Sequence, residues 1–135
     1  MYAIKAEVGD ANARSWTFTA HKTMYGGKRA SPGDLIFIFA SENEGGFGLV
    51  AFGTVTHAEA IPLKPGVDRQ TPRISIVVDR IGSAKRRLGR VELKPFNDWK
   101  DGRPETELNF KLYRQATDKI VGLSQEATEF LRGFF

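Results

Sequence analysis

Short stretches of apolar and β-branched residues, each of strand length, recur along the chain between polar connections. The most apolar of them, residues 35–40 (Leu-Ile-Phe-Ile-Phe-Ala), has no polar position, which is typical of a strand buried on both faces. A turn is predicted just before it at Pro32-Gly33, because proline fixes φ and glycine accepts a positive φ. After a loop at 43–46, residues 48–61 form a long β-branched stretch, and we expect the two strands to pair as a hairpin.

The rest of the pattern predicts more strands and one clear helix. Further strands are predicted at residues 2–8, 15–20, 73–81, 90–93 and 119–123. Residues 94–118 look irregular, with a helical turn near Phe110. Ser124 is a good N-cap for a C-terminal helix, in which apolar residues recur at helical spacing at Ala127, Phe130, Leu131 and Phe134. These elements predict an α+β, mostly β fold: a small closed or half-closed β-barrel with peripheral helices, in a single domain spanning residues 1–135.

The composition is that of one folded domain and narrows the available chemistry. The 135 residues are 41% hydrophobic and 27% charged, and cysteine is absent, which excludes disulfides and thiolate metal sites. The first residues lack the apolar stretch of a signal peptide, and the run at 35–40 is too short to span a bilayer. We therefore expect a soluble, cytoplasmic, monomeric protein with no membrane partner.

Positive charge is concentrated in one segment of a chain whose net charge is +4. Residues 80–94 include six basic residues and only one acid, Glu92. The basic residues are Arg80, Lys85, Arg86, Arg87, Arg90 and Lys94. Such a segment creates a positive local field that attracts phosphate. The predicted phosphate contacts are Lys85, Arg86, Arg87, Arg90 and Lys94. A solvated loop without a partner is the alternative.

The motifs of common catalytic sites are missing: there is no nucleophile elbow, no phosphate-binding loop and no His-Glu-x-x-His. Residues 46–51 fit a degenerate dinucleotide pattern, but the segment after them is strand-like and lacks the helix N-terminus that would hold a pyrophosphate. His21 and His57 are the only histidines, and the absence of cysteine and of a close pair of carboxylates disfavours a zinc site. No catalytic residue, metal ligand or cofactor is predicted.

Four segments, in their order along the chain, resemble the EVE domain. They are Tyr2–Glu7, Pro32–Ser41, Gly48–Val55 and Phe110–Gln115. The EVE domain belongs to the PUA-like group, whose other members include the YTH, ASCH and SRA domains. The resemblance implies a PUA-like β-barrel whose cleft receives a modified base. It also implies pocket positions at Glu7, Trp16, Ser41, Arg114 and Gln115.

A base lifted from its stack needs an aromatic face and fixed hydrogen-bonding groups at its edge. The ring candidates for the base pocket are Trp16, Trp99, Tyr25 and Tyr113, and the candidates for reading the edge are Ser41, Asn43, Arg114 and Gln115. For each ring the alternative is a partly buried core residue. Polar neighbours on both sides of Trp99 favour an exposed ring there.

Together these observations predict a non-catalytic module that recognises a modified base in DNA or RNA, or a modified nucleoside, through an aromatic pocket beside a basic surface. Two alternatives stay open. One is an enzyme, such as an ASCH-like nuclease or amide hydrolase, to whose Gly-x-Lys motif residues 26–29 (Gly-Gly-Lys-Arg) bear a faint likeness. The other is a small-metabolite sensor or a protein-interaction adaptor.

Overall fold

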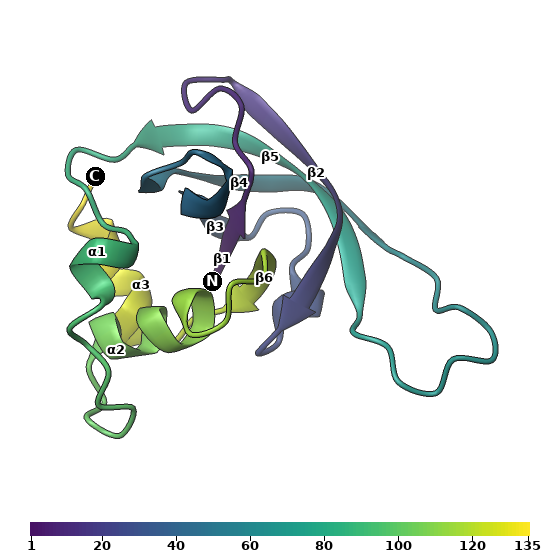
Figure 1. Ribbon diagram of the computed structural model, residues 1–135. Coiled ribbons are helices and arrows are strands. Elements are labelled where there is room, and N and C mark those ends of the chain that lie inside the picture. The colour runs from purple at the N-terminus through teal and green to yellow at the C-terminus, as the bar shows by residue number, and fades with distance from the viewer.

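The computed structural model describes residues 1–135, which form a barrel with helices along one side (Figure 1). The strands are β1 (Tyr2–Ala6), β2 (Ser15–Met24), β3 (Leu35–Ala40), β4 (Gly48–Ala60), β5 (Arg73–Ser83) and β6 (Lys119–Gly122). The helices are α1 (Arg90–Leu93), α2 (Pro104–Leu108) and α3 (Gln125–Arg132), the 3-10 turns η1 (Gly27–Arg29) and η2 (Glu42–Glu44), and the π-helical turn η3 (Asn109–Tyr113). This architecture confirms the predicted α+β, mostly β barrel with peripheral helices. None of the helices has the length and apolar character needed to cross a membrane.

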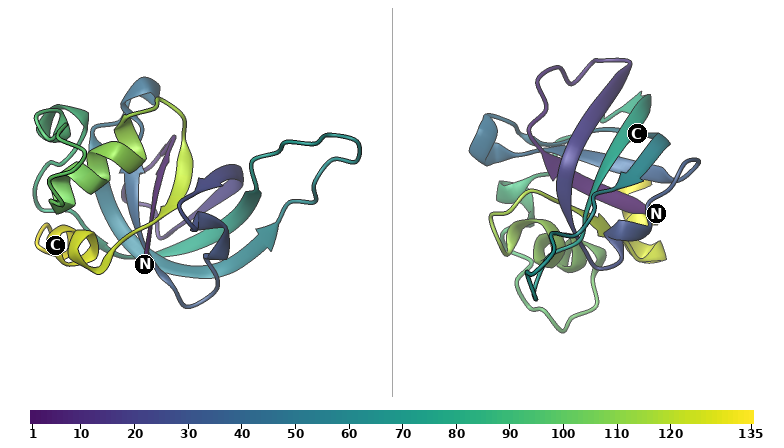
Figure 2. Two further views of the ribbon diagram at one scale, coloured as in Figure 1. Left: turned by 90° about the horizontal axis from the view of Figure 1, so that it is seen from below. Right: turned by 90° about the vertical axis from the view of Figure 1, so that its right-hand side faces the viewer.

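The barrel closes through a very short strand. Its strand order is β1-β3-β4-β5-β2-β6, with β1 parallel to β3 and antiparallel to β6. On its other side β6 pairs with only two residues of β2, Thr23 and Met24. The earlier part of β2 therefore has no strand beside it on that side, and the barrel is open there. At the opposite side β4 and β5 form a long hairpin, whose connection at 61–72 projects away from the helices (Figure 2).

The predicted burial of residues 35–40 on both faces is confirmed, because β3 separates two cores. Ile36 and Ile38 point into the barrel interior, whereas Phe37 and Phe39 point outward beneath the helices. The predicted hairpin with the next strand is also present, as β3 and β4 pair antiparallel. The turn before β3 contains Gly33 at a φ of 96°, in the left-handed region that glycine accepts without strain.

The second core holds the helices against the barrel. Each helical segment contributes a fully buried leucine: Leu93 of α1, Leu108 of α2, Leu112 of η3 and Leu131 of α3. Burial of one such side chain stabilises the fold by about 1.5–3 kcal/mol. The Ser124 hydroxyl accepts a hydrogen bond from the backbone N–H of Ala127, which confirms the predicted N-cap of α3.

Two predicted elements differ in the structure. Residues 90–93 form a helical turn and not a strand, because the Glu92 carboxylate accepts a hydrogen bond from the Gly89 N–H at 2.8 Å and caps the turn. The turn buries Leu93 and leaves Val91 exposed, so no strand partner is needed. In the stretch 94–118 the helical turn predicted near Phe110 is present as η3, but it is preceded by α2, which was not predicted. Pro104 occupies the first turn of α2, where its missing N–H costs nothing.

Trp16, the first candidate for a pocket wall, is a core residue. It lies opposite Val78 on β5, its side chain enters the barrel interior, and only 8% of its surface is exposed. Its Nε1–H donates to the backbone oxygen of Asp10 at 2.8 Å, so the one polar atom of the ring is satisfied. The prediction that this ring forms a base pocket is therefore corrected.

Replacing Trp16 with alanine should lower the free energy of unfolding by about 3–5 kcal/mol, because it removes a large ring from the barrel core and leaves a cavity. Urea denaturation measures this loss. Trp99→Ala is the control, since that ring is 43% exposed and should lose far less. Equal losses in the two variants would contradict the core assignment of Trp16.

Candidate functional site

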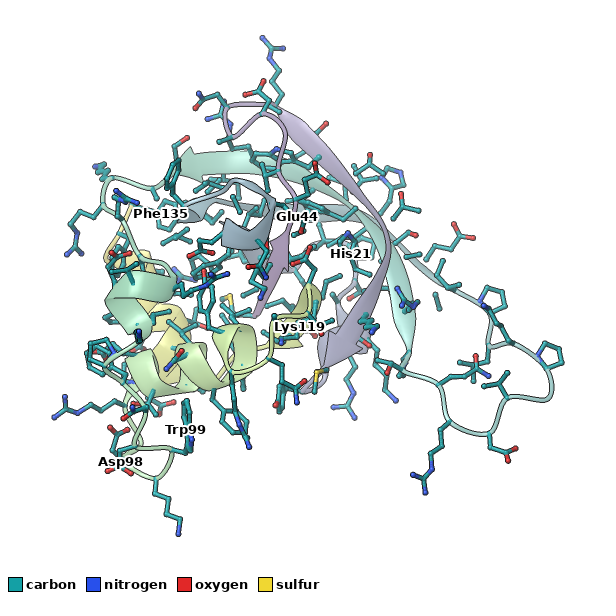
Figure 3. All side chains as sticks on the ribbon, viewed as in Figure 1. His21, Glu44, Asp98, Trp99, Lys119 and Phe135 are labelled. Atoms are coloured by element: carbon teal, nitrogen blue, oxygen red, sulfur yellow. The ribbon has the colours of Figure 1, made fainter.

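The open side of the barrel contains a cavity of about 510 Å³, called here the His21 cavity. Its lining residues are Thr19, Ala20, His21, Lys22, Asn43, Glu44, Arg73, Ala116, Thr117 and Asp118. They come from the end of β2, from η2, from the start of β5 and from the segment that precedes β6. Figure 3 shows His21 and Glu44 close together at this opening, with Lys119 below them. Only two lining residues are apolar, so the cavity suits a polar ligand.

A β-bulge turns His21 toward this cavity. On β2 and β5, Phe18 lies opposite Ile76 and His21 lies opposite Ile74, so three steps along β2 match two steps along β5. Regular alternation would have placed Ala20 on the inward face. The extra residue changes the phase, and His21 faces the same way as the buried Ile74. The imidazole meets the Phe18 ring edge-on, with the ring centroids 5.8 Å apart.

The bulge is held by side chains from β5. Ala20 has a φ of 54°, a left-handed conformation that costs a non-glycine residue about 1–2 kcal/mol. Its N–H donates to Ser75 Oγ at 2.9 Å, and its carbonyl oxygen accepts from Arg73 Nη1 at 2.7 Å. Burial lowers the pKa of His21, which keeps its imidazole neutral at neutral pH.

The wall opposite β2 is η2, and the Glu42 carboxylate anchors it. This carboxylate accepts hydrogen bonds from the Tyr113 hydroxyl at 3.0 Å and from the backbone N–H of Arg90 at 2.6 Å. Burial, together with the charge of Glu42, raises the pKa of Tyr113, so the hydroxyl remains a donor at any physiological pH. The Arg90 side chain also donates to Asn43 Oδ1 at 2.6 Å. Asn43 is thereby fixed between the cavity and α1.

Three carboxyl groups meet at this cavity. Glu44 is within hydrogen-bonding reach of Asp118 and Glu7, and the hydrogen bond with Asp118 is the main cause that raises the pKa of Glu44 to about 7. Desolvation and the negative charges of Asp118 and Glu7 act in the same direction. At neutral pH a substantial share of the Glu44 side chains therefore carries a proton, and the group can donate as well as accept a hydrogen bond.

Two buried lysines lie beneath these carboxyl groups. Lys5 and Lys119 are cross-strand neighbours on β1 and β6, and both are almost wholly buried on the helix side of the barrel. The Lys5 ammonium lies 5.2 Å from the centroid of the Tyr113 ring, and the Lys119 ammonium donates to the Gln115 carbonyl at 3.3 Å. Burial, and then the charge of Lys5, lowers the pKa of Lys119 to about 8.

The basic segment runs from the end of β5 into α1. Two of its cations are engaged in the fold: Arg90 holds Asn43, and Arg86 donates to the Gly133 carbonyl at 2.8 Å and stacks on the Phe134 ring at 4.3 Å. The other three predicted phosphate contacts, Lys85, Arg87 and Lys94, are exposed, and their side chains make no hydrogen bond. Through Arg90 and Asn43 this segment is continuous with the wall of the His21 cavity.

The structure brings some of the predicted pocket residues together and separates others. Those at or beside the His21 cavity are Glu7, Ser41, Asn43, Tyr113 and Gln115, of which Asn43 alone lines it. Ser41, the N-cap residue of η2, is buried and its hydroxyl has no partner. Trp99, Tyr25 and Arg114 lie on a separate surface beside η3, and Figure 3 shows Trp99 well away from the opening. The expected tryptophan wall is therefore absent from this cavity.

Sequence reasoning missed His21, Glu44, Arg73 and Asp118 as lining residues. The alternation of residues along β2 gives no sign of the bulge that turns His21 inward, so the sequence does not indicate that this side chain lines a cavity. Glu44 and Asp118 are 74 positions apart in the chain, and only the closure of the barrel brings them together. Near Glu44, only the glycine-containing loop after residue 40 indicates a place where a binding site could form.

No family model and no curated protein matches the sequence. Among solved structures, the chain is similar to the DUF55 domain of human thymocyte nuclear protein 1, with 16% identity, a TM-score of 0.64, and coverage of 98% of this chain and 96% of that one. It is also similar to human THYN1 protein in complex with 5-methylcytosine-containing DNA, with 16% identity, a TM-score of 0.63, and coverage of 98% and 95%. The fold is that of the DUF55 domain. This likeness confirms the small PUA-like barrel fold that the sequence predicted.

In this DUF55-type barrel, Glu44→Gln should remove a pH dependence of stability. The pKa of Glu44 rises from about 4.5 in the unfolded chain to about 7 in the fold, so its stabilising contribution is complete below pH 4.5 and is lost as pH rises to 7. The variant should therefore be more stable than the wild type above pH 7 and lose this advantage toward pH 4.5. Urea denaturation at pH 4.5 and above pH 7 measures the stability difference between the variant and the wild type. Glu59→Gln, at an exposed position, is the control. An identical stability difference at both pH values would contradict the clustering of Glu44 with Asp118.

Proposed function

We propose that this chain is a non-catalytic module that binds DNA and receives one modified base in the His21 cavity. The observation that carries the proposal is the 2.6 Å hydrogen bond between Arg90 and Asn43, which joins the basic segment to the cavity wall. A strand whose phosphates lie along the basic segment would pass directly over the cavity mouth. DNA is favoured because the structurally similar human THYN1 protein is in complex with 5-methylcytosine-containing DNA.

The size and chemistry of the cavity support a base as its ligand. Its volume of about 510 Å³ falls within the range of about 300–1,000 Å³ that is usual for small-molecule sites. The His21 ring and the Arg73 guanidinium offer flat faces on which a base can stack. A base that has left its stack brings a polar edge, and the carboxyl groups of Glu44 and Asp118 can accept hydrogen bonds from an exocyclic amino group there.

The buried lysines support the same role. A cavity that held only the three carboxyl groups would repel a strand of phosphates, whereas the ammonium groups of Lys5 and Lys119 offset part of that charge from below. Because these lysines are buried, they are not available for surface phosphate contacts. Affinity would come from the exposed cations of the basic segment, and selectivity from the cavity.

Ala116→Phe tests the cavity, because it places a ring in the His21 cavity from an exposed position outside regular structure. The wild type should bind a duplex with one 5-methylcytosine more tightly than the unmodified duplex, and the variant should lose this preference while keeping the salt-dependent binding. Fluorescence anisotropy with matched DNA and RNA duplexes measures the preference for the modified base and the salt dependence of binding. Ala60→Phe, at the exposed end of β4, is the control.

Three outcomes of the same experiment would contradict the proposal. If the wild type shows no preference for the modified base, the cavity does not select it. If free 5-methyl-2′-deoxycytidine binds as tightly as the duplex, the chain is a metabolite sensor. Cleavage of the duplex during incubation would instead support the enzyme alternative.

Replacing Lys85, Arg87 and Lys94 together with glutamine should weaken DNA binding equally for all sequences. Each lost phosphate contact reduces the slope of log K against log salt by about 0.9, so the slope should fall by about 2.7 if all three touch phosphate. Arg86 and Arg90 are left in place because they hold α3 and Asn43. The control is Lys64→Gln with Arg69→Gln, which removes two positive charges from the hairpin connection at the opposite end of the molecule (Figure 2). An unchanged slope would show that the basic segment does not contact the backbone.

A further inference from the structure

A row of three aromatic rings lies on the surface beside η3, outside the His21 cavity. Phe110 is the middle ring, with its centroid 5.9 Å from that of Tyr25 and 5.5 Å from that of Trp99. Tyr25 and Trp99 are each 43% exposed, whereas large rings usually bury most of their surface. The three rings come from the end of β2, from η3 and from the loop before α2, so tertiary folding assembles the row.

Cations lie over these rings. The Arg114 guanidinium is 4.7 Å from the centroid of Phe110 and 5.9 Å from that of Trp99, and the Lys111 ammonium is 5.5 Å from that of Tyr25. Lys111 is neutralised by Glu107 at 3.0 Å, but Arg114 is exposed and has no ion pair. Aromatic faces interleaved with an unpaired guanidinium are the combination that binds unstacked bases and their phosphates.

The row also borders a hollow of about 250 Å³ between the loop and α2. Trp99 and Phe110 form two of its walls, and the other lining residues are Gly102, Arg103, Thr106 and Glu107. Thr106 is 3% exposed, and its hydroxyl lies within reach of the Asp101 carboxylate. The hollow is therefore bordered by aromatic, cationic and polar groups.

The backbone of Tyr25 has a strained, left-handed conformation, and its ring is exposed to solvent. Its φ of 53° is one of only two positive values among the non-glycine residues, and the other belongs to Ala20 of the His21 cavity. A left-handed conformation is unusual for an aromatic residue, and such strain often accompanies binding sites. The Tyr25 carbonyl accepts from the Gly122 N–H at 3.2 Å, and a side chain at Gly122 would collide with that oxygen.

We infer that the Tyr25–Phe110–Trp99 row is a second nucleic-acid contact, which stacks an unpaired base of the strand whose modified base enters the His21 cavity. This inference rests on the proposed function and names the form of DNA that it prefers, a locally unpaired strand. The chain supports it: Arg114, whose guanidinium lies over Phe110 and Trp99, is only two residues before Ala116 of the cavity wall, so the segment 114–116 leads from the ring row to the cavity.

A peptide ligand is the less favoured occupant of this surface. Three carboxylates near the rings are engaged: Glu107 is bound to Lys111 and Ser124, Asp101 accepts from the Arg103 N–H, and Asp98, beside Trp99, accepts from the Lys100 N–H. The one unpaired charge over the rings is positive, and it would repel a cationic peptide. A strand of negative phosphates is complementary to it.

The fluorescence of Trp99 provides the test, because the only other tryptophan, Trp16, is buried in the barrel. Single-stranded oligothymidylate should quench this fluorescence on binding. Trp99→Ala should weaken the binding by about 5- to 150-fold, which is the loss of one stacked base at 1–3 kcal/mol. Trp99→Phe should keep most of the affinity but show no quenching, which separates stacking from a structural role. Leu63→Ala, at an exposed apolar position in the hairpin connection, is the control.

The outcomes separate this inference from the proposed function. If Trp99→Ala binds single-stranded and 5-methylcytosine DNA as the wild type does, while Ala116→Phe still loses its preference for the modified base, the ring row is not a contact and the cavity function stands. If Trp99→Ala weakens binding but the wild type has no preference for a modified base, the ring row stands and the cavity function fails. Quenching by a lysine-rich peptide, and none by the oligonucleotide, would overturn the assignment to nucleic acid.

Discussion

Closure of the barrel by a strand of only four residues is the constraint on which the candidate site depends. β6 reaches just two residues of β2, and beyond that point β2 runs on with no strand beside it on that side. The gap is bordered by η2 and by the segment before β6, which line the His21 cavity together with β2. The bulge lies in the pairing of β2 with β5, where Arg73 and Ser75 hold it, and it turns His21 toward this gap.

Electrostatic balance at this opening links the barrel to the helical layer. The carboxyl groups lie above the two buried lysines, which are cross-strand neighbours and would repel each other without compensation. Glu42 extends the network to η3 through Tyr113 and to α1 through the Arg90 N–H. The loops that surround the cavity are therefore tied to rigid elements, an arrangement that keeps a binding site in one geometry without a bound ligand.

The likeness to the DUF55 domain shows how little of the sequence the fold requires. At 16% identity nearly the whole chain still matches that domain. The shared requirement is physical: β3 needs apolar residues on both faces, because Ile36 and Ile38 fill the barrel while Phe37 and Phe39 support the helices. Many apolar sequences of suitable volume meet this requirement. The polar residues at the opening are under no such constraint from the core.

The six strands of the barrel, the turn at Gly33 and the cap at Ser124 could be predicted from the chain alone, because they depend on local pattern and backbone preference. Residues 90–93 are the exception, since their pattern predicted a strand and the structure has a helical turn there. The sequence also indicated that Trp99 would be exposed, since its neighbours along the chain are polar. The burial of Trp16 and the inward turn of His21 were decided only by the tertiary structure, because a period-2 pattern does not say which face closes inward or where a bulge changes the phase. The same holds for the meeting of Glu44 with Asp118 and for the aromatic row, since each joins residues far apart in the chain that only closure of the barrel and packing of the helices bring together.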